Sequence, residues 1–232
     1  MLRLEARLAT RLRRTILLAL ALASAPVLAA PAHAARCAKS YSYAGVVSAR
    51  SAHGVRATIE ALSVPRVSSG HVAGWVGVGG VGAGPHGETE WIQVGYSGLY
   101  GGKSQLYYEV TPPNGRTRYI AVDPDLEPGE RHTVAVHEMQ GRRDWWRVRV
   151  DGRSVGVPVH LPGSHGRWRP VATAESWNAG NRSCNGFAYR FSHVGVALRP
   201  NSRWRPFEPG YKLEDPGYRV ARARAGFVAS AR

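Results

Sequence analysis

From about residue 55 onward, apolar and polar residues alternate in short runs that glycine, proline, asparagine and aspartate interrupt. Such alternation is typical of strands with one buried face, and the interrupting residues are those that favour turns. No helical pattern separates these runs. The pattern predicts ten or so strands, over residues 55–64, 71–78, 90–97, 106–111, 118–122, 131–137, 145–150, 154–160, 168–177, 187–198 and 219–228.

Many short strands without intervening helices predict an all-β fold, because strands with one apolar face must bury that face against a second sheet. The expected architecture is a two-sheet antiparallel sandwich or jelly roll. No repeat of solenoid or propeller length is present. We therefore expect a single β-sandwich domain over residues 35–232, present as a monomer.

The first 34 residues have a different character. Five arginines precede an apolar run over residues 16–30, and Ala32-His33-Ala34 follows as a cleavage pattern of small residues. These are the marks of a signal peptide, and Pro26 interrupts the apolar run too early for a membrane span. We expect residues 1–34 to be removed. The mature protein would then be secreted, extracellular and not bound to a membrane.

The chain is basic, with a formal net charge of +15. Removing the five Arg and one Glu of residues 1–34 leaves 26 basic and 15 acidic side chains, a net charge of +11. Residues 142–149, Arg-Arg-Asp-Trp-Trp-Arg-Val-Arg, mix cationic and aromatic residues, as proteins that bind single-stranded nucleic acid do. Because the protein is expected to be exported, we expect no nucleic-acid partner, and an anionic cell-envelope surface would suit this charge better.

Only two cysteines, Cys37 and Cys184, are present, which excludes a zinc site built from four thiolates. Outside the cytoplasm two cysteines can pair. The bridge would close a loop of 147 positions. In the chain-entropy description, closing so long a loop stabilises the fold by roughly 4–5 kcal/mol. The prediction is a disulfide between Cys37 and Cys184.

Histidine spacing offers no metal motif. His132 and His137 lie on one predicted strand an odd number of residues apart, so they point to opposite faces. Glu138 beside them does not complete a zinc motif, which needs both imidazoles on one side. The glycine-rich loop 79–84 lacks the lysine and the helix that hold phosphate. We expect no metal and no cofactor.

Two predicted strands carry a more specific signal. Alternation places Gln93 on one face with Trp91, and Glu175 on one face with Thr173 and Trp177. A carboxylate can accept a proton from water and then return it to a leaving amine. An uncharged amide can donate a hydrogen bond to a developing oxyanion. Gln93 and Glu175 are therefore candidate catalytic residues.

At these residues the sequence resembles the glutamic peptidases (eqolisins), in order and approximate spacing from about residue 58 to residue 196. Ile-Gln-Val-Gly at 92–95 is similar to the family's strand with a catalytic Gln, and Ala-Glu at 174–175 to its Ala-Glu-Trp. One difference is that Ser176 separates Glu175 from the next Trp. Further similar segments are Thr-Ile-Glu-Ala-Leu-Ser-Val-Pro at 58–65, Trp-Val-Gly at 75–77, Tyr-Tyr-Glu at 107–109 before Pro112, and Pro-Gly-Glu at 128–130.

The resemblance implies a fold, an activity and a set of site residues. The implied fold is a concanavalin A-like sandwich, and the implied activity is cleavage of peptide or protein substrates in acid. Gln93 and Glu175 would be the catalytic pair. Trp75, Tyr107 and Glu109 would line the substrate cleft.

A second hypothesis is a non-catalytic sandwich module that binds carbohydrate or the cell envelope. Its sequence basis is a set of four tryptophans whose rings could stack on sugars. We expect at least half of them to belong to the core and its rim instead. The four are Trp145, Trp146, Trp168 and Trp177.

Overall fold

The computed structural model describes residues 41–113, 115–181 and 184–231. The predicted signal peptide at 1–34 and Cys37 lie outside these ranges, so the leader and the disulfide stay predictions. The described residues belong to one compact unit, Ala34–Arg232. No helix in this part of the chain has the length and the apolar character needed to cross a membrane.

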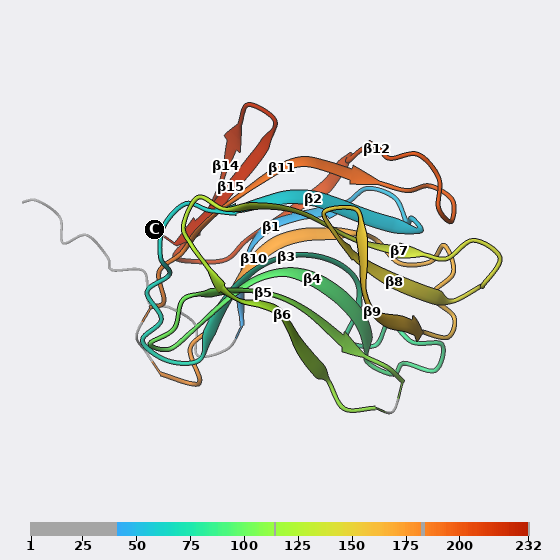
Figure 1. Ribbon diagram of the computed structural model, residues 1–232, viewed down its shortest axis with the longest axis horizontal. Coiled ribbons are helices and arrows are strands. Elements are labelled where there is room, and N and C mark those ends of the chain that lie inside the picture. The colour runs from blue at the N-terminus through green and yellow to red at the C-terminus, as the bar shows by residue number, and fades with distance from the viewer. Residues whose placement is uncertain (1–40, 114, 182–183, 232) are drawn as a thin grey trace, which may run out of the picture. The chain divides into compact units, whose positions relative to one another are not determined.

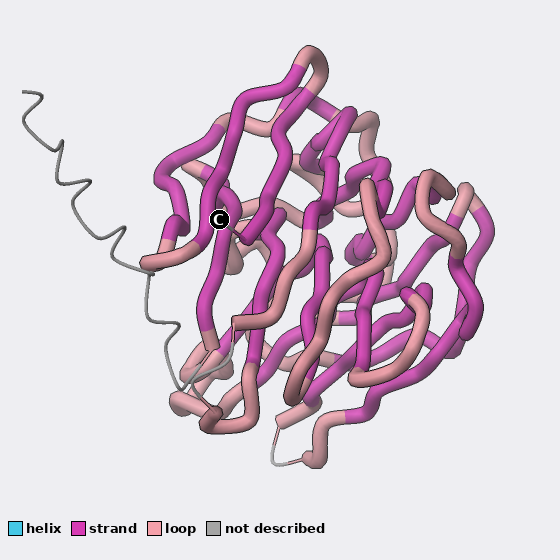
Figure 2. The backbone as a smooth tube through the Cα atoms, turned by 90° about the vertical axis from the view of Figure 1, so that its left-hand side faces the viewer, coloured by secondary structure: helices cyan, strands magenta, loops and turns pink. Residues whose placement is uncertain are grey.

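The described chain folds into two antiparallel sheets that pack as layers (Figure 1). Figure 2 shows strands and loops throughout. This architecture confirms the predicted all-β, two-sheet sandwich. The first sheet has the order β13 (Pro209–Glu214), β1 (Ser42–Ser48), β10 (Val171–Trp177), β3 (His71–Gly80), β4 (Glu90–Leu99), β5 (Ser104–Thr111) and β6 (Arg118–Leu126). The second has the order β14 (Tyr218–Ala223), β15 (Gly226–Ala231), β11 (Ala188–Val196), β2 (Gly54–Ala61), β7 (Arg131–Glu138), β8 (Trp145–Val150) and β9 (Arg153–His160), with β12 (Arg205–Pro206) paired to β11.

The core lies between the sheets and takes every second residue of the central strands. On β4, Ile92, Val94 and Tyr96 are fully buried. Trp146 and Trp168 stack in this core with ring centroids 6.2 Å apart, which confirms that at least half of the four tryptophans are structural. Full burial of one large apolar side chain stabilises the fold by about 1.5–3 kcal/mol. The other face of the first sheet points away from this core.

Three differences from the predicted strands have simple causes. β1 was not predicted, because nearly all its residues are buried and the sequence shows no alternation there. β13 was not predicted either, because most of its residues are exposed; it begins at Pro209, on an edge strand where a proline leaves no central ladder bond unmade. The single strand predicted over 219–228 is two strands, β14 and β15, joined by a turn at Arg224 and Ala225.

Glu90, the first residue of β4, is fully buried. Neither of its carboxylate oxygens has a hydrogen-bond partner among the described residues. Burial, with smaller contributions from the charges of Glu88 and Asp144, raises the pKa of Glu90 from its ordinary value of 4.5 to about 7. The folded protein therefore holds this proton more tightly than the unfolded chain does. The associated stability is complete below pH 4.5 and is lost as the pH rises through 7.

Replacing Glu90 with Gln removes this titration. The difference in unfolding free energy, Glu90→Gln minus wild type, should therefore depend on pH. It should be about 1–3 kcal/mol more positive above pH 7 than below pH 4.5. Urea unfolding of both proteins at the two ends of this range measures the difference. Glu127→Gln, at an exposed carboxylate, is the matched control and should show no such change. If the unfolding free energies of Glu90→Gln and the wild type differ by the same amount below pH 4.5 and above pH 7, Glu90 does not have the raised pKa described here.

Candidate functional site

The outer face of the first sheet carries the candidate site, since residues paired across neighbouring strands point to the same side. Trp75 on β3 pairs with Thr173 on one side and with Gly95 on the other. Gly95 in turn pairs with Tyr107 on β5. Every second residue of these four adjacent strands therefore points to this face. It includes all five side chains that the sequence singled out: Trp75, Gln93, Tyr107, Glu109 and Glu175.

These residues line a cleft made of two adjoining pockets. Trp75, Gln93, Glu109 and Glu175 line the first, which has a volume of about 270 Å³. Tyr107 lines the second, of about 90 Å³, where Glu109 and Glu175 recur. Gln93 and Glu175 are each only 7% exposed, so both polar groups are largely shielded from solvent. The structure brings the predicted residues together around one recess.

Gln93 is oriented by a buried tyrosine. Its Nε2 donates a hydrogen bond to the Tyr107 hydroxyl at 3.0 Å. Burial raises the pKa of Tyr107 well above its ordinary value, so the hydroxyl keeps its proton. The ring of Tyr107 stacks on Tyr119 with centroids 4.9 Å apart, which fixes its position. Because an amide NH₂ has two N–H donors, Gln93 has a second one available for a ligand.

Glu175 faces a histidine at the start of β3. Glu175 Oε1 lies 3.3 Å from His71 Nε2. The next polar residue, Ser176, is buried on the opposite face, where its Oγ accepts a hydrogen bond from Asn185 Nδ2 at 3.3 Å. The pairing of β10 with β1 and β3 runs through Ser176 without a bulge. The extra serine therefore leaves Trp177 on the same face as Glu175.

An aromatic rim borders the cleft beside Glu175. The ring of Trp177 lies 6.0 Å from Tyr41 and 5.6 Å from His71, centroid to centroid. Sequence reasoning missed His71 as a site residue. A signal was present, because His71 precedes Trp75 by an even number of residues on the same strand.

Glu109 is a second carboxyl group in the cleft. Trp91 Nε1 donates a hydrogen bond to its Oε1 at 3.0 Å. Burial raises the pKa of Glu109, and the nearby charge of Glu175 raises it further. Glu109 therefore keeps its proton up to a higher pH than an ordinary glutamate does. The cleft can combine a proton acceptor, an amide donor and a neutral acid.

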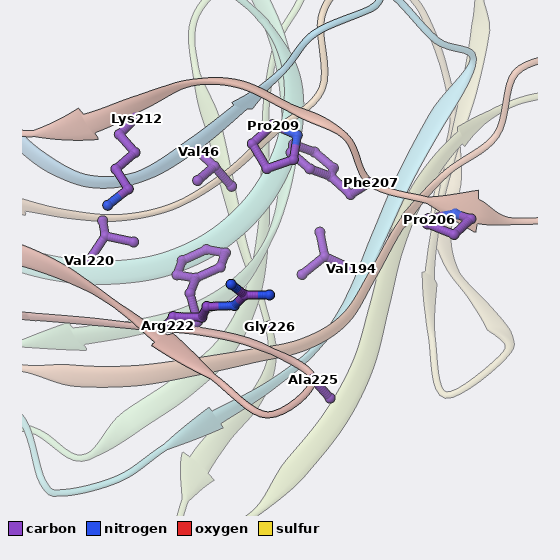
Figure 3. A pocket seen from close by; sticks show the side chains of 11 residues that line it. Val46, Val194, Pro206, Phe207, Pro209, Lys212, Val220, Arg222, Ala225 and Gly226 are labelled. Carbon is purple, nitrogen blue, oxygen red and sulfur yellow. The ribbon is translucent and has the colours of Figure 1, made fainter.

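A separate cavity of about 460 Å³ lies where β13 faces β14 and β15 (Figure 3). Its lining is mainly apolar, with Val46, Val194 and Phe207 contributed by different segments. Lys212 and Arg222 are its cationic lining residues. No carboxylate and no side-chain amide lines it, so it offers no acid or base of the kind found in the cleft.

The sequence matches no protein-family model, and no curated protein matches it. The fold is similar to solved structures. Scytalido-glutamic peptidase with a peptide-based transition-state analogue aligns with a TM-score of 0.53 and 14% identity, covering 83% of this chain and 97% of that chain. The same peptidase with a transition-state analogue inhibitor gives a TM-score of 0.52 and 15% identity over 83% and 97%. SCP-B, a member of the eqolisin family in complex with the tripeptide Ala-Ile-His, gives 0.48 and 14% over 83% and 97%.

At such low identity the likeness establishes the fold and not the activity. The chain is an all-β sandwich, as the residue pattern predicted, and of the concanavalin A-like kind, as the resemblance implied.

Proposed function

We propose that this protein is a hydrolase of the glutamic-peptidase type, in which Glu175 and Gln93 cleave peptide bonds. The observation that carries the proposal is the meeting of these two buried groups, from separate strands, in one pocket. The solved structures similar to this chain include a peptidase bound to transition-state analogues, which supports the choice of reaction. The predicted leader would deliver the enzyme outside the cytoplasm.

In the proposed reaction, the Glu175 carboxylate accepts a proton from a water molecule as the water oxygen attacks the carbonyl carbon of the peptide. The carbonyl π electrons move to the oxygen, which becomes an oxyanion. The free N–H of Gln93 donates a hydrogen bond to that oxyanion. When the tetrahedral intermediate collapses, the C–N bond breaks and protonated Glu175 gives its proton to the departing amine. Both residues then return to their starting states.

Neighbouring groups hold this pair in place. The Tyr107 hydroxyl fixes Gln93 from one side, and His71 lies against Glu175. Burial raises the pKa of Glu109, so this second carboxyl group adds less negative charge to the cleft than an ordinary glutamate would. Trp75 Nε1 is buried and has no hydrogen-bond partner among the described residues. A substrate carbonyl bound in the pocket would satisfy this donor.

A second candidate function rests on the aromatic rim. Tyr41 and Trp177 are 47% and 36% exposed, and their rings stack at 6.0 Å. Exposed stacked rings of this kind suit the flat face of a sugar. In this alternative the protein binds polysaccharide and catalyses nothing. Such binding would not depend on the charge of Glu175.

The test is digestion of an unfolded protein by the purified wild type, from acid to neutral pH, in water enriched in ¹⁸O. Mass spectrometry should show new peptides whose carboxyl ends carry one solvent oxygen, because water is the nucleophile. No cleavage at any pH would overturn the proposal. Retention on insoluble polysaccharide, equal in the wild type and in Glu175→Gln, would then select the binding module.

A further inference from the structure

Outside the cleft, two histidines and a glutamate converge at one end of the second sheet. His53 directly precedes β2, Glu138 ends β7, and His165 lies between β9 and β10. One ligand atom from each of the three lies within 4.8 Å of the others. The imidazole rings of His53 and His165 meet edge to face, with centroids 4.8 Å apart.

Glu138 is at the centre of this cluster and is fully buried. Its Oε2 lies 2.6 Å from His53 Nδ1, and its Oε1 lies 2.8 Å from His165 Nδ1. The backbone N–H of Asp144 also donates to Oε1, at 2.7 Å. Among the described residues, no Arg or Lys forms an ion pair with Glu138. A carboxylate removed from water is stabilised by a compensating cation, and a metal ion bound between Glu138 and these imidazoles would supply it.

The three side chains are held by the backbone around them. Glu138 N–H donates to the carbonyl of His53 at 2.7 Å, and His53 N–H donates to that of Ala197 at 2.7 Å. His165 N–H donates to Asp144 Oδ1 at 2.7 Å. In known metal sites, hydrogen bonds around the ligand residues fix the orientation of the ligands. The cluster is therefore pre-organised before any ion arrives.

A second carboxylate, that of Asp144, lies beside the cluster. Asp144 is adjacent to Glu138, and its charge is among those that raise the pKa of buried Glu90. The cation paired with Asp144 is Arg143, whose Nε lies 3.7 Å from Asp144 Oδ2 and whose side chain is mostly exposed.

We propose that His53, Glu138 and His165 bind a divalent transition-metal ion, with Zn²⁺ as the reference ion. Two imidazole nitrogens and one carboxylate oxygen form a donor set that suits such ions, and they leave a position for water. Binding requires each ligating nitrogen to give up its proton, so the hydrogen bonds to Glu138 are exchanged for bonds to the metal. The His165 side chain is 36% exposed, which gives the ion an entry path.

Local sequence patterns could not reveal this cluster. His53 and Glu138 are 85 residues apart, and Glu138 and His165 are 27 apart. The two histidines considered from the sequence, His132 and His137, are not members of this cluster. His132 Nδ1 pairs with Asp151 at 2.7 Å, and buried His137 Nδ1 lies 3.4 Å from the carbonyl of Glu138.

The experiment is calorimetric titration of the full chain, freed of metal with EDTA, with Zn²⁺ at neutral pH. The wild type should bind one ion, and His53→Ala and His165→Ala should each weaken the affinity by about 100-fold or more. Co²⁺ should give the visible spectrum of a low-coordinate site in the wild type and not in these variants. His132→Ala, which removes a histidine paired with a carboxylate elsewhere, should bind like the wild type.

Thermal unfolding provides the second readout. Zn²⁺ should raise the melting temperature of the wild type and leave that of His165→Ala unchanged, because only a folded site binds the ion. His165 is partly exposed, so this variant decides the matter even if His53→Ala fails to fold. Absence of Zn²⁺ binding, or equal binding by wild type and His165→Ala, would overturn the proposal. None of these readouts depends on peptide hydrolysis.

Discussion

Replacing Glu175 with Gln should lower kcat for peptide hydrolysis by about 10²–10⁴-fold, the range that a general base contributes. The amide has nearly the same size and keeps the position beside His71, but it cannot accept a proton from water. KM should change little, because the substrate is held mainly by the surrounding cleft. Steady-state kinetics on a fluorogenic peptide that the wild type cleaves measures both constants.

The matched control for this substitution is Glu127→Gln. Glu127 is exposed and pairs with Lys103 on the surface, so its kinetics should equal those of the wild type. Circular dichroism and thermal unfolding establish that Glu175→Gln is folded. If folded Glu175→Gln retains the activity of the wild type, Glu175 is not the base.

Replacing Gln93 with Ala should lower kcat by about 10²–10³-fold, which is the effect of removing one oxyanion donor elsewhere. The loss should fall on kcat with little change in KM, because the hydrogen bond strengthens as charge develops on the oxygen. Tyr107→Phe should cause a smaller loss of about 10-fold. It keeps the ring stacked on Tyr119 and removes only the hydroxyl that positions Gln93.

Gln140→Ala is the control for this series, since Gln140 is an exposed amide outside the cleft. The order of activity should be wild type and Gln140→Ala, then Tyr107→Phe, then Gln93→Ala. A rise in KM at unchanged kcat in Gln93→Ala would mean that Gln93 binds substrate without stabilising the transition state, and would refute its oxyanion role.

The strand that the sequence predicted most closely has one buried face. β8 was predicted with its observed bounds, because its buried and half-buried residues alternate strictly. β1 was missed because nearly all its residues are buried, and the edge strand β13 because most of its residues are exposed. Alternation is absent in both cases, so periodicity carries no information there.

The same reasoning reached part of the cleft. Gln93 and Glu175 stood out as polar residues among apolar and aromatic neighbours on predicted strands. The contact between His71 and Glu175 could not be derived, because it depends on how β3 pairs with β10. Residues gathered from a loop and two strand ends, such as His53, Glu138 and His165, depend still more on the complete fold.

The pairing of β10 has a consequence for how this protein can vary. Glu175 points into the cleft while its neighbours Ala174 and Ser176 are buried on the opposite side. Inserting or deleting a single residue within the strand would move Glu175 to the side now occupied by Ala174, leaving an unpaired carboxylate among apolar groups. Length changes should therefore be tolerated in the connecting loops and excluded from β3, β4, β5 and β10. Within these strands a core position and a cleft position must stay an odd number of positions apart, so that each side chain keeps its own face.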